Sequence, residues 1–281
     1  MRKKSIAAAI LAALVIVLTF TSCSVNQKGA QYKEIDGGWM LYRYSSSSTE
    51  TEFTVPDTYE GKPVLEISDF GLANAEYLTK ITIGKNVQKI NDWSLTNCPK
   101  LKEFVVDAEN TAFTTVDGVL YTKDLTELVS YPNGKTELVK DSNDKVIGGG
   151  TLILPDTCKR IRPNAAYLCG NLYTVQLNEG LETIGDKAFL KCWHYSELKI
   201  PSTVTAIGAD AFSYTDSLKN LEIPSNVQSI GDYAFYSTGS SVEKVIVHNT
   251  EENLELGKDW SPHKKNSVRE KVPVEFTGAN A

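Results

Sequence analysis

Cysteine is the most reactive residue type in this chain, and one cysteine stands next to a tryptophan and a histidine in the sequence. Cys192-Trp193-His194 would suit nucleophilic catalysis if the thiol were partly exposed and a base lay next to it. The spacing places no base there, and motifs such as G-x-S-x-G and H-E-x-x-H do not occur. There is no C-x-x-C pair and the three histidines are scattered, so we expect neither a metal site nor a cofactor.

The sequence around this cysteine repeats at a fixed interval. The stretches IGDKAFLKC, IGADAFSYT and IGDYAFYST begin at Ile184, Ile207 and Ile230, each 23 residues after the last. Ile161 precedes them by the same step, and Ile67 and Ile90 form an earlier pair, 71 residues before that series resumes. Periods of roughly 20–50 residues are typical of stacked repeats. The interval therefore predicts a solenoid in which each coil buries the apolar side of its neighbour.

Other positions of the repeat indicate what each coil contains. Apolar residues fourteen and sixteen after the isoleucine alternate with polar ones, as in Ile81/Ile83 and Leu221/Ile223, and this predicts a strand. Stacked strands would form a parallel sheet along one face. Aspartates stand two residues after the isoleucine, where a helical turn would have its N-cap: Asp69, Asp92, Asp186 and Asp232. Calcium binding is the alternative, but calcium-binding solenoids use a glycine-rich nonapeptide that differs from this repeat.

The repeat resembles a known family. Residues 78–86 and 218–226 fit L-x-x-L-x-L-x-x-N. With IPSTVTAIGADAF and IPSNVQSIGDYAF, they are similar to the BspA-like class of bacterial leucine-rich repeats, from roughly Phe53 to His248. We therefore expect a β-rich α/β solenoid: a right-handed leucine-rich repeat stack with a parallel sheet on one face, short helical turns on the other and an inserted β-hairpin.

Residues outside the regular repeat define the expected domain boundaries. Asp36-Gly37-Gly38 suits the turn of a hairpin that caps the first coil, and Pro132-Asn133-Gly134 suits the turn of the inserted hairpin. Caps are expected because an open solenoid end exposes apolar atoms and strand edges. The expected organisation is a signal peptide at 1–22, a lipidated cysteine and tether at 23–33, a capping hairpin at 34–52, repeats at 53–248 with the insertion at about 107–150, and a C-terminal cap at 249–281.

The remaining cysteines occupy packing positions of the repeat. Three of them lie eight residues after an isoleucine, where Ala75, Thr215 and Thr238 stand in other coils, and this mixture is typical of a core position. A disulfide between Cys169 and Cys192 is the alternative, because adjacent coils bring equivalent residues within bridging range. The predicted structural core comprises Ile67, Ile90, Ile161, Ile184, Ile207, Ile230, Phe189, Phe212, Phe235, Cys98, Cys169 and Cys192.

The N-terminus predicts export and a lipid anchor. Basic residues 2–4 precede the apolar run from Ile6 to Phe20, and Thr21-Ser22-Cys23 resembles the end of a bacterial lipobox, with Phe20 departing from the usual aliphatic residue. Cys23 is therefore the expected lipidation site. An ordinary cleaved signal or an uncleaved anchor is the alternative. The formal net charge of -6 argues against nucleic acid as a partner.

The outward strand positions form the candidate binding face. They lie thirteen and fifteen residues after the isoleucine: Lys80, Thr82, Glu103, Val105, Thr174, Gln176, Glu197, Lys199, Asn220, Glu222, Lys244 and Ile246. Solenoid faces of this kind often bind partners. The family resemblance implies adhesion, so we expect a non-catalytic protein on the bacterial cell surface that binds a protein or glycan partner. A scaffolding lipoprotein of the envelope is the second interpretation, and an enzyme of unrecognised type is the third.

Overall fold

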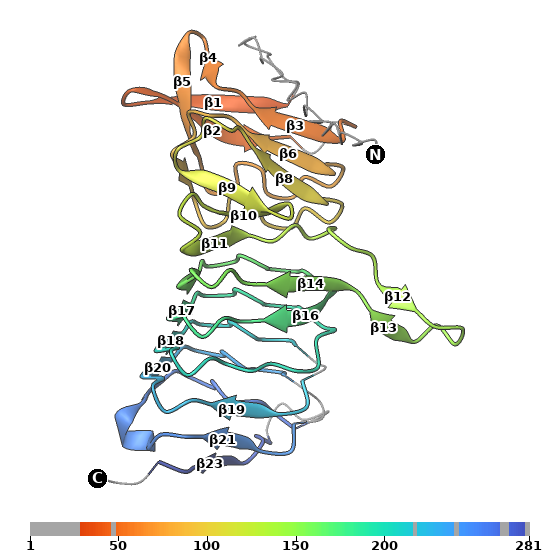
Figure 1. Ribbon diagram of the computed structural model, residues 1–281, viewed down its shortest axis with the longest axis vertical. Coiled ribbons are helices and arrows are strands. Elements are labelled where there is room, and N and C mark those ends of the chain that lie inside the picture. The colour runs from red at the N-terminus through yellow and green to blue at the C-terminus, as the bar shows by residue number, and fades with distance from the viewer. Residues whose placement is uncertain (1–28, 46–48, 216–217, 239–241, 265–269, 279–281) are drawn as a thin grey trace, which may run out of the picture.

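The computed structural model describes residues 29–45, 49–215, 218–238, 242–264 and 270–278. The expected signal peptide and Cys23 lie outside these residues. The chain forms a solenoid of stacked coils, with the N-terminal strands at one end of the long axis and β23 (Val274–Phe276) at the other (Figure 1). Within the described residues the only helix is a single 3-10 turn, η1 (Glu251–Asn253).

The isoleucines of the repeat form short strands that stack in register. Ile161, Ile184, Ile207, Ile230 and Leu256 pair one after another in parallel, and Leu128 precedes them. Figure 1 shows β17, β18 and β20 along the left side of the stack. The strands of this sheet, from β9 to β22, are β9 (Phe113–Val116), β10 (Val119–Thr122), β11 (Glu127–Ser130), β15 (Arg160–Ile161), β17 (Thr183–Ile184), β18 (Ala206–Ile207), β20 (Ser229–Ile230) and β22 (Glu255–Leu256).

The longer strands of the repeat form three small parallel sheets instead of one continuous sheet. The sheets are β3 (Glu52–Val55) with β6 (Lys80–Ile83) and β8 (Glu103–Val106); β14 (Gly150–Ile153) with β16 (Leu172–Gln176); and β19 (Leu221–Ile223) with β21 (Val245–Val247) and β23. The first break lies at the insertion that follows β8. The second lies at residues 197–200, which occupy the strand position of the repeat without forming a strand.

The expected short helical turns are wrong. Lys187 and Lys191 in one coil, and Asp210 and Tyr214 in the next, have positive φ angles between 53° and 62°, which a right-handed helix cannot contain. Alternate N–H groups also donate to acceptors outside the turn. The Phe189 N–H donates to Ala211 O of the next coil (2.8 Å), whereas the Ala188 N–H donates to Gly185 O within its own turn (3.3 Å). Each turn is thus bonded half to itself and half to its neighbour.

The insertion differs from the single hairpin that the sequence predicts. β9, β10 and β11 form an antiparallel meander that joins the eight-stranded sheet, with the first turn at Asp117-Gly118. A separate hairpin, β12 (Val139–Lys140) with β13 (Val146–Gly148), projects from the stack (Figure 1). Residues 132–134, the predicted turn, instead bind neighbouring coils: the Gly134 N–H donates to Leu101 O (2.8 Å).

The two ends of the stack carry additional strands. β1 (Ala30–Ile35) and β2 (Gly38–Tyr44) form an antiparallel hairpin with its turn at residues 36–37, and β2 pairs in parallel with β5 (Lys62–Ile67). β5 pairs with β4 (Thr58–Tyr59) on one side and with β7 (Lys89–Ile90) further along. At the other end, β22 and β23 continue both strand rows beyond the last regular repeat.

The interior consists of two apolar clusters, and the strands of the insertion lie between them and contribute side chains to both. Leu120 and Val129 belong to the N-terminal cluster, whereas Tyr121 and Leu128 belong to the C-terminal one. Successive strand residues point to opposite faces, so β10 and β11 contribute to both cores at once. Every isoleucine of the repeat is buried, with at most 3 % of its surface exposed. In the C-terminal cluster, Phe189, Phe212 and Phe235 stack with ring centroids 5.3 and 5.2 Å apart.

Candidate functional site

The outward positions of the three small sheets form the surface that we call the strand face. Lys80 lies opposite Glu103, and Thr82 opposite Val105, on β6 and β8. Glu222 lies opposite Ile246 on β19 and β21. These pairs place the predicted residues side by side along the solenoid axis within each sheet. Thr174 and Gln176 stand on β16, while Asn220 and Lys244 immediately precede β19 and β21, and Glu197 and Lys199 lie outside strands.

The structure adds residues to this face that the repeat columns did not include. Ile153 on β14 lies opposite Gln176 and is 61 % exposed. Glu52 on β3 forms an ion pair with Lys80 (2.6 Å), and Glu275 on β23 forms one with Lys244. The face therefore combines paired charges with exposed aliphatic side chains. Leu152 and Leu154 have the two-residue spacing of inward strand positions, and this was the sequence signal that Ile153 points outward, but the insertion obscured its position in the repeat.

The insertion interrupts the strand face between β8 and β14. The Phe104 N–H donates to Gly118 O (2.9 Å), so the tip of the β9–β10 hairpin lies beside β8. A Cβ on Gly118 would stand 3.0 Å from the Cβ of Glu103, which leaves little room for any side chain other than glycine. Glu103 and Val105 are consequently separated from Thr174 by the insertion, and the predicted ladder consists of separate segments.

The four cysteines of the described residues are buried free thiols. The Cys169–Cys192 disulfide, kept as an alternative above, is thus not formed in this structure. Cys98 Sγ donates to Leu72 O (3.3 Å), and Cys192 Sγ donates to Ala166 O (3.1 Å). Burial raises the pKa of Cys98 to about 11 and raises that of Cys192 further. These thiols stay protonated at neutral pH, so the Cys192-Trp193-His194 sequence does not provide a thiolate nucleophile.

Two of the four aspartates at this repeat position, Asp186 and Asp232, bind the next coil instead of capping helices. Asp186 Oδ1 accepts from the Ala209 N–H (2.8 Å), and Asp232 Oδ1 accepts from the Lys258 N–H (2.6 Å). Coils approach closely here, because a Cβ on Gly208 would stand 2.4 Å from Asp186 Oδ1. No group of three or more His, Cys, Asp or Glu side chains in the described part of the chain is arranged to hold a metal ion.

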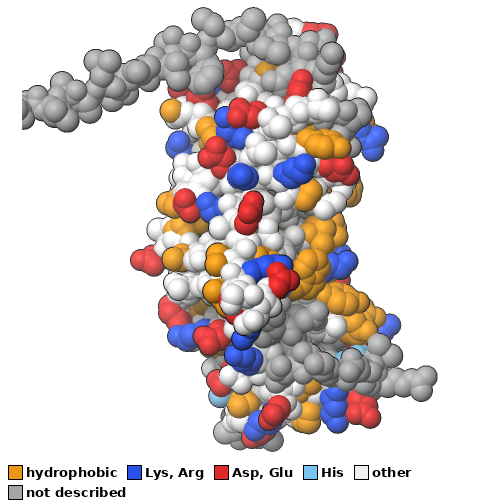
Figure 2. All heavy atoms as spheres, turned by 90° about the vertical axis from the view of Figure 1, so that its right-hand side faces the viewer, with side chains coloured by type: hydrophobic (Ala, Val, Ile, Leu, Met, Phe, Trp, Pro, Cys, Tyr) orange, Lys and Arg blue, Asp and Glu red, His pale blue; other side chains and the backbone are white. Residues whose placement is uncertain are grey.

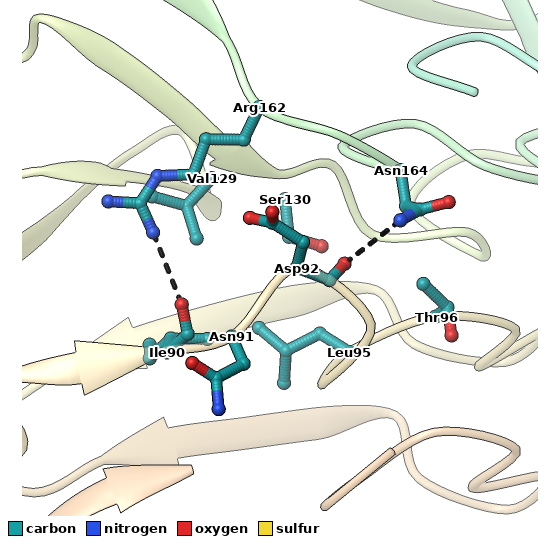
Figure 3. A pocket seen from close by; sticks show the side chains of 9 residues that line it. All are labelled: Ile90, Asn91, Asp92, Leu95, Thr96, Val129, Ser130, Arg162 and Asn164. Atoms are coloured by element: carbon teal, nitrogen blue, oxygen red, sulfur yellow. Dashed lines mark hydrogen bonds between the residues drawn. The ribbon is translucent and has the colours of Figure 1, made fainter. Parts of the chain in front are cut away.

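Side chains join the coil of Ile90 to the coils that follow the insertion. In the regular coils, a backbone N–H of the next coil donates to the isoleucine carbonyl, as from Gly185 to Ile161 O (2.9 Å). At Ile90 the donor is Arg162 Nη1 (3.2 Å), and Asn164 Nδ2 donates to Asp92 O (3.3 Å) (Figure 3). No strand pair among the described residues links β7 to β11. We call this contact the seam.

The seam contains a small cavity and several polar groups. The cavity of about 10 Å³ is lined by residues that include Asp92, Ser130 and Arg162 (Figure 3), and this volume accommodates about one water molecule. Burial raises the pKa of the Asp92 carboxyl, while Arg162 and Arg160 oppose that rise. Arg162 Nε also pairs with Glu127 Oε2 at 2.5 Å. The site lacks space for a substrate, and its polar groups serve to connect two parts of the stack.

Comparisons with known proteins identify related repeats and related folds. The family model for the BspA type leucine rich repeat region matches six copies, over residues 42–138 and 150–257. A leucine-rich repeat protein from Eubacterium ventriosum ATCC 27560 is similar in structure, with a TM-score of 0.59, 24% sequence identity, and coverage of 75% of this chain and 54% of that one. The chain thus spans about half the length of that protein.

Two further solved structures show weaker similarity. The pneumococcal vaccine antigen PcpA covers 89% of both chains at 18% identity, with a TM-score of 0.47. A leucine-rich repeat protein from Bacteroides ovatus ATCC 8483 has 16% identity and a TM-score of 0.47, and the match covers 83% of this chain and 66% of that one. No curated protein shows significant sequence similarity to the chain. The described residues include no helix that is long and apolar enough to cross a membrane.

Proposed function

Because the chain belongs to the BspA-type leucine-rich repeat family, we propose that it is a non-catalytic binding protein of the bacterial cell surface. Proteins of this family are typically associated with the cell surface. The proposal includes a lipid anchor at Cys23 that holds the solenoid at the membrane. Stable anchoring requires more than one acyl chain, or one acyl chain together with a second membrane contact. Adhesion to host proteins, as the family resemblance implies, is the role we assign to the strand face.

One observation supports the strand face as the binding surface. Exposed aliphatic side chains stand among paired charges on it: Val105 and Ile153 are 38 % and 61 % exposed, and the Lys80–Glu52 ion pair flanks the first of them. Non-obligate protein interfaces have this mixed composition. A protein partner therefore suits this face better than a ligand that is recognised by charge alone.

Surface exposure is the first test. Protease treatment of intact cells should release the repeats if the protein faces outward. If the repeats stay protected until the cells are lysed, the adhesin role is wrong and the envelope scaffold is favoured.

The second test addresses the face itself. The double variant Val105→Glu with Ile246→Glu places two charges on the strand face, and a bound partner would bury them. We expect this variant to bind arrays of extracellular matrix proteins at least about tenfold more weakly than the wild type. Tyr42→Glu is the matched control, because Tyr42 is 51 % exposed on β2. Equal binding by the wild type and the double variant would show that another surface is responsible.

A further inference from the structure

The outer surface of the turns carries aromatic side chains that the core does not use. Phe70 stacks on Trp93 with ring centroids 5.7 Å apart, and Trp93 meets Tyr167 at 5.9 Å. Tyr214 meets Tyr236 at 5.8 Å in two later coils. We call the following residues the aromatic strip: Phe70, Trp93, Tyr167, Trp193, Tyr214 and Tyr236. Figure 2 shows hydrophobic side chains gathered down the right-hand side of its view, with lysine and arginine side chains beside them.

Folding does not require aromatic residues at these positions. The position of Phe70 and Trp93 in the repeat is occupied by Lys187 and Asp210 in other coils, and that of Tyr214 by Lys191. Phe70 is 53 % exposed, and Trp193 and Tyr214 are each 41 % exposed. Because polar residues satisfy the same backbone positions, the rings contribute little that the solenoid needs. Exposed apolar side chains that gather on one face are more typical of interaction sites than apolar residues that are scattered singly.

One ring is held in place by its neighbour coil. A Cβ on Gly170 would stand 2.7 Å from the indole of Trp193, so the ring lies directly against the backbone of the preceding coil. Gly170 occupies the same repeat position as Trp193, one coil earlier. The contact holds Trp193 at the surface while almost half of the side chain remains accessible.

Hydrogen-bonding groups stand beside the rings, and the Lys187 ammonium interacts with the carboxylate of Asp210, which offsets part of its charge. Lys187 Nζ lies 5.5 Å from the Trp93 ring centroid, and Lys191 Nζ lies 6.0 Å from that of Tyr214. These two lysines, from one turn, connect the two halves of the strip. Near its start, Asn97 Nδ2 donates to Asn74 Oδ1 (2.6 Å) on the same side of the coils. Amides and ammonium groups beside aromatic rings are well suited to sugar hydroxyls.

The arrangement of the strip favours a linear ligand. Successive coils are spaced by about 4.8 Å, as in any sheet, so rings on neighbouring coils, such as Phe70 with Trp93 and Tyr214 with Tyr236, follow one another along the solenoid axis. The rings stand three to nine residues after the isoleucine, so the strip also shifts sideways across the turns. Protein interfaces concentrate their binding energy in a compact, fully desolvated centre, which a narrow strip does not provide. A polysaccharide instead presents one sugar after another, each with an apolar C–H face for a ring and a rim of hydroxyl groups.

We propose that the aromatic strip binds a neutral polysaccharide chain that lies along the solenoid axis. The strip occupies the turns of the coils and the strand face occupies the longer strands, so this proposal goes beyond the protein-binding role and does not depend on it.

Native electrophoresis of the full chain in detergent, through gels that contain a soluble neutral polysaccharide, tests the proposal. The probes are hydroxyethyl cellulose, xylan, mannan and dextran, with polygalacturonate as the anionic comparison. We expect at least one neutral polymer to retard the wild type, and Trp193→Ala combined with Tyr214→Ala to weaken this binding by about tenfold or more. Trp193→Phe retains a ring and should bind better than Trp193→Ala. Tyr42→Ala, on β2, is the matched control and should stay within about twofold of the wild type.

Several outcomes would overturn the proposal. One is the absence of retardation by all four neutral polymers. Another is retardation of the double variant equal to that of the wild type, at an unchanged unfolding midpoint. Retardation by polygalacturonate alone, abolished by salt, would assign the surface to its lysines. If the strand-face variants lose binding to matrix proteins while the strip binds no polysaccharide, the protein-binding role stands and the strip proposal fails.

Discussion

At the scale of single residues, one repeat position combines packing with hydrogen bonding. Cys98, Cys192 and Thr238 lie eight residues after an isoleucine, and each donates to a backbone carbonyl of the preceding coil. The sequence predicted a packing position from the mixture of Cys, Thr and Ala. It did not reveal the donor role, although cysteine and threonine share a donor that alanine lacks. Asn133 has a similar connecting role, because it accepts from the Cys98 N–H (3.0 Å) and donates to Tyr167 O (2.7 Å).

Thiol labelling tests the burial of these cysteines. We expect native protein purified from cells to react with a disulfide reagent at none of Cys98, Cys158, Cys169 and Cys192, because burial raises their pKa values and blocks access. In guanidinium chloride all four should react. A fifth reactive thiol would show that Cys23 is not acylated, and rapid native labelling of Cys192 would contradict the buried position.

At the scale of elements, the turn between the two strand rows depends on an aromatic stack. The rings of Phe189, Phe212 and Phe235 are nearly parallel, with interplanar angles of 7°, and each is fully buried. The five-residue offset from the isoleucine predicted these core positions. It could not predict the conformation of the turn, because an amphipathic segment with Asp at its start has the same pattern in a helix and in this turn.

Removal of the central ring should destabilise the stack. Phe212→Ala leaves a cavity between two rings, and we expect it to lower the free energy of unfolding by roughly 3–5 kcal/mol in urea denaturation. Phe70→Ala is the matched control, since Phe70 also lies in a turn but is 53 % exposed and stacks on Trp93 at the surface, and its effect should stay below about 1.5 kcal/mol. Similar losses in both variants would argue against the stacked core.

At the scale of the whole molecule, the insertion divides one solenoid into two cores. β10 and β11 carry side chains into both, and the seam beside Asp92 is bridged by Arg162 and Asn164. Side-chain donors there replace the backbone donors of the regular coils. At the seam, the contact between the two parts of the solenoid therefore depends on a few individual side chains.

Arg162 tests this dependence. Arg162→Ala leaves the Ile90 carbonyl without its donor and Glu127 without its closest partner, and we expect a loss of about 1–3 kcal/mol in the free energy of unfolding. Hydrogen exchange should accelerate more at the seam than at β17 and β18. Arg160→Ala is the matched control, because its side chain is 53 % exposed and lies 3.7 Å from Glu127; its effect should stay within about 0.5 kcal/mol. Equal exchange in both variants would show that the seam does not depend on Arg162.

The sequence alone determined the repeat: a period of 23 residues requires equivalent side chains to stack, and Ile161, Ile184, Ile207 and Ile230 do so in one buried row. The group that each backbone N–H binds became evident only from the stacked coils. The turns divide their hydrogen bonds between two coils, and the insertion sends Arg162 across a seam to Ile90. The reason is that side-chain spacing is a local property of the chain, whereas a hydrogen-bond partner one or more coils away depends on how the neighbouring coils are placed.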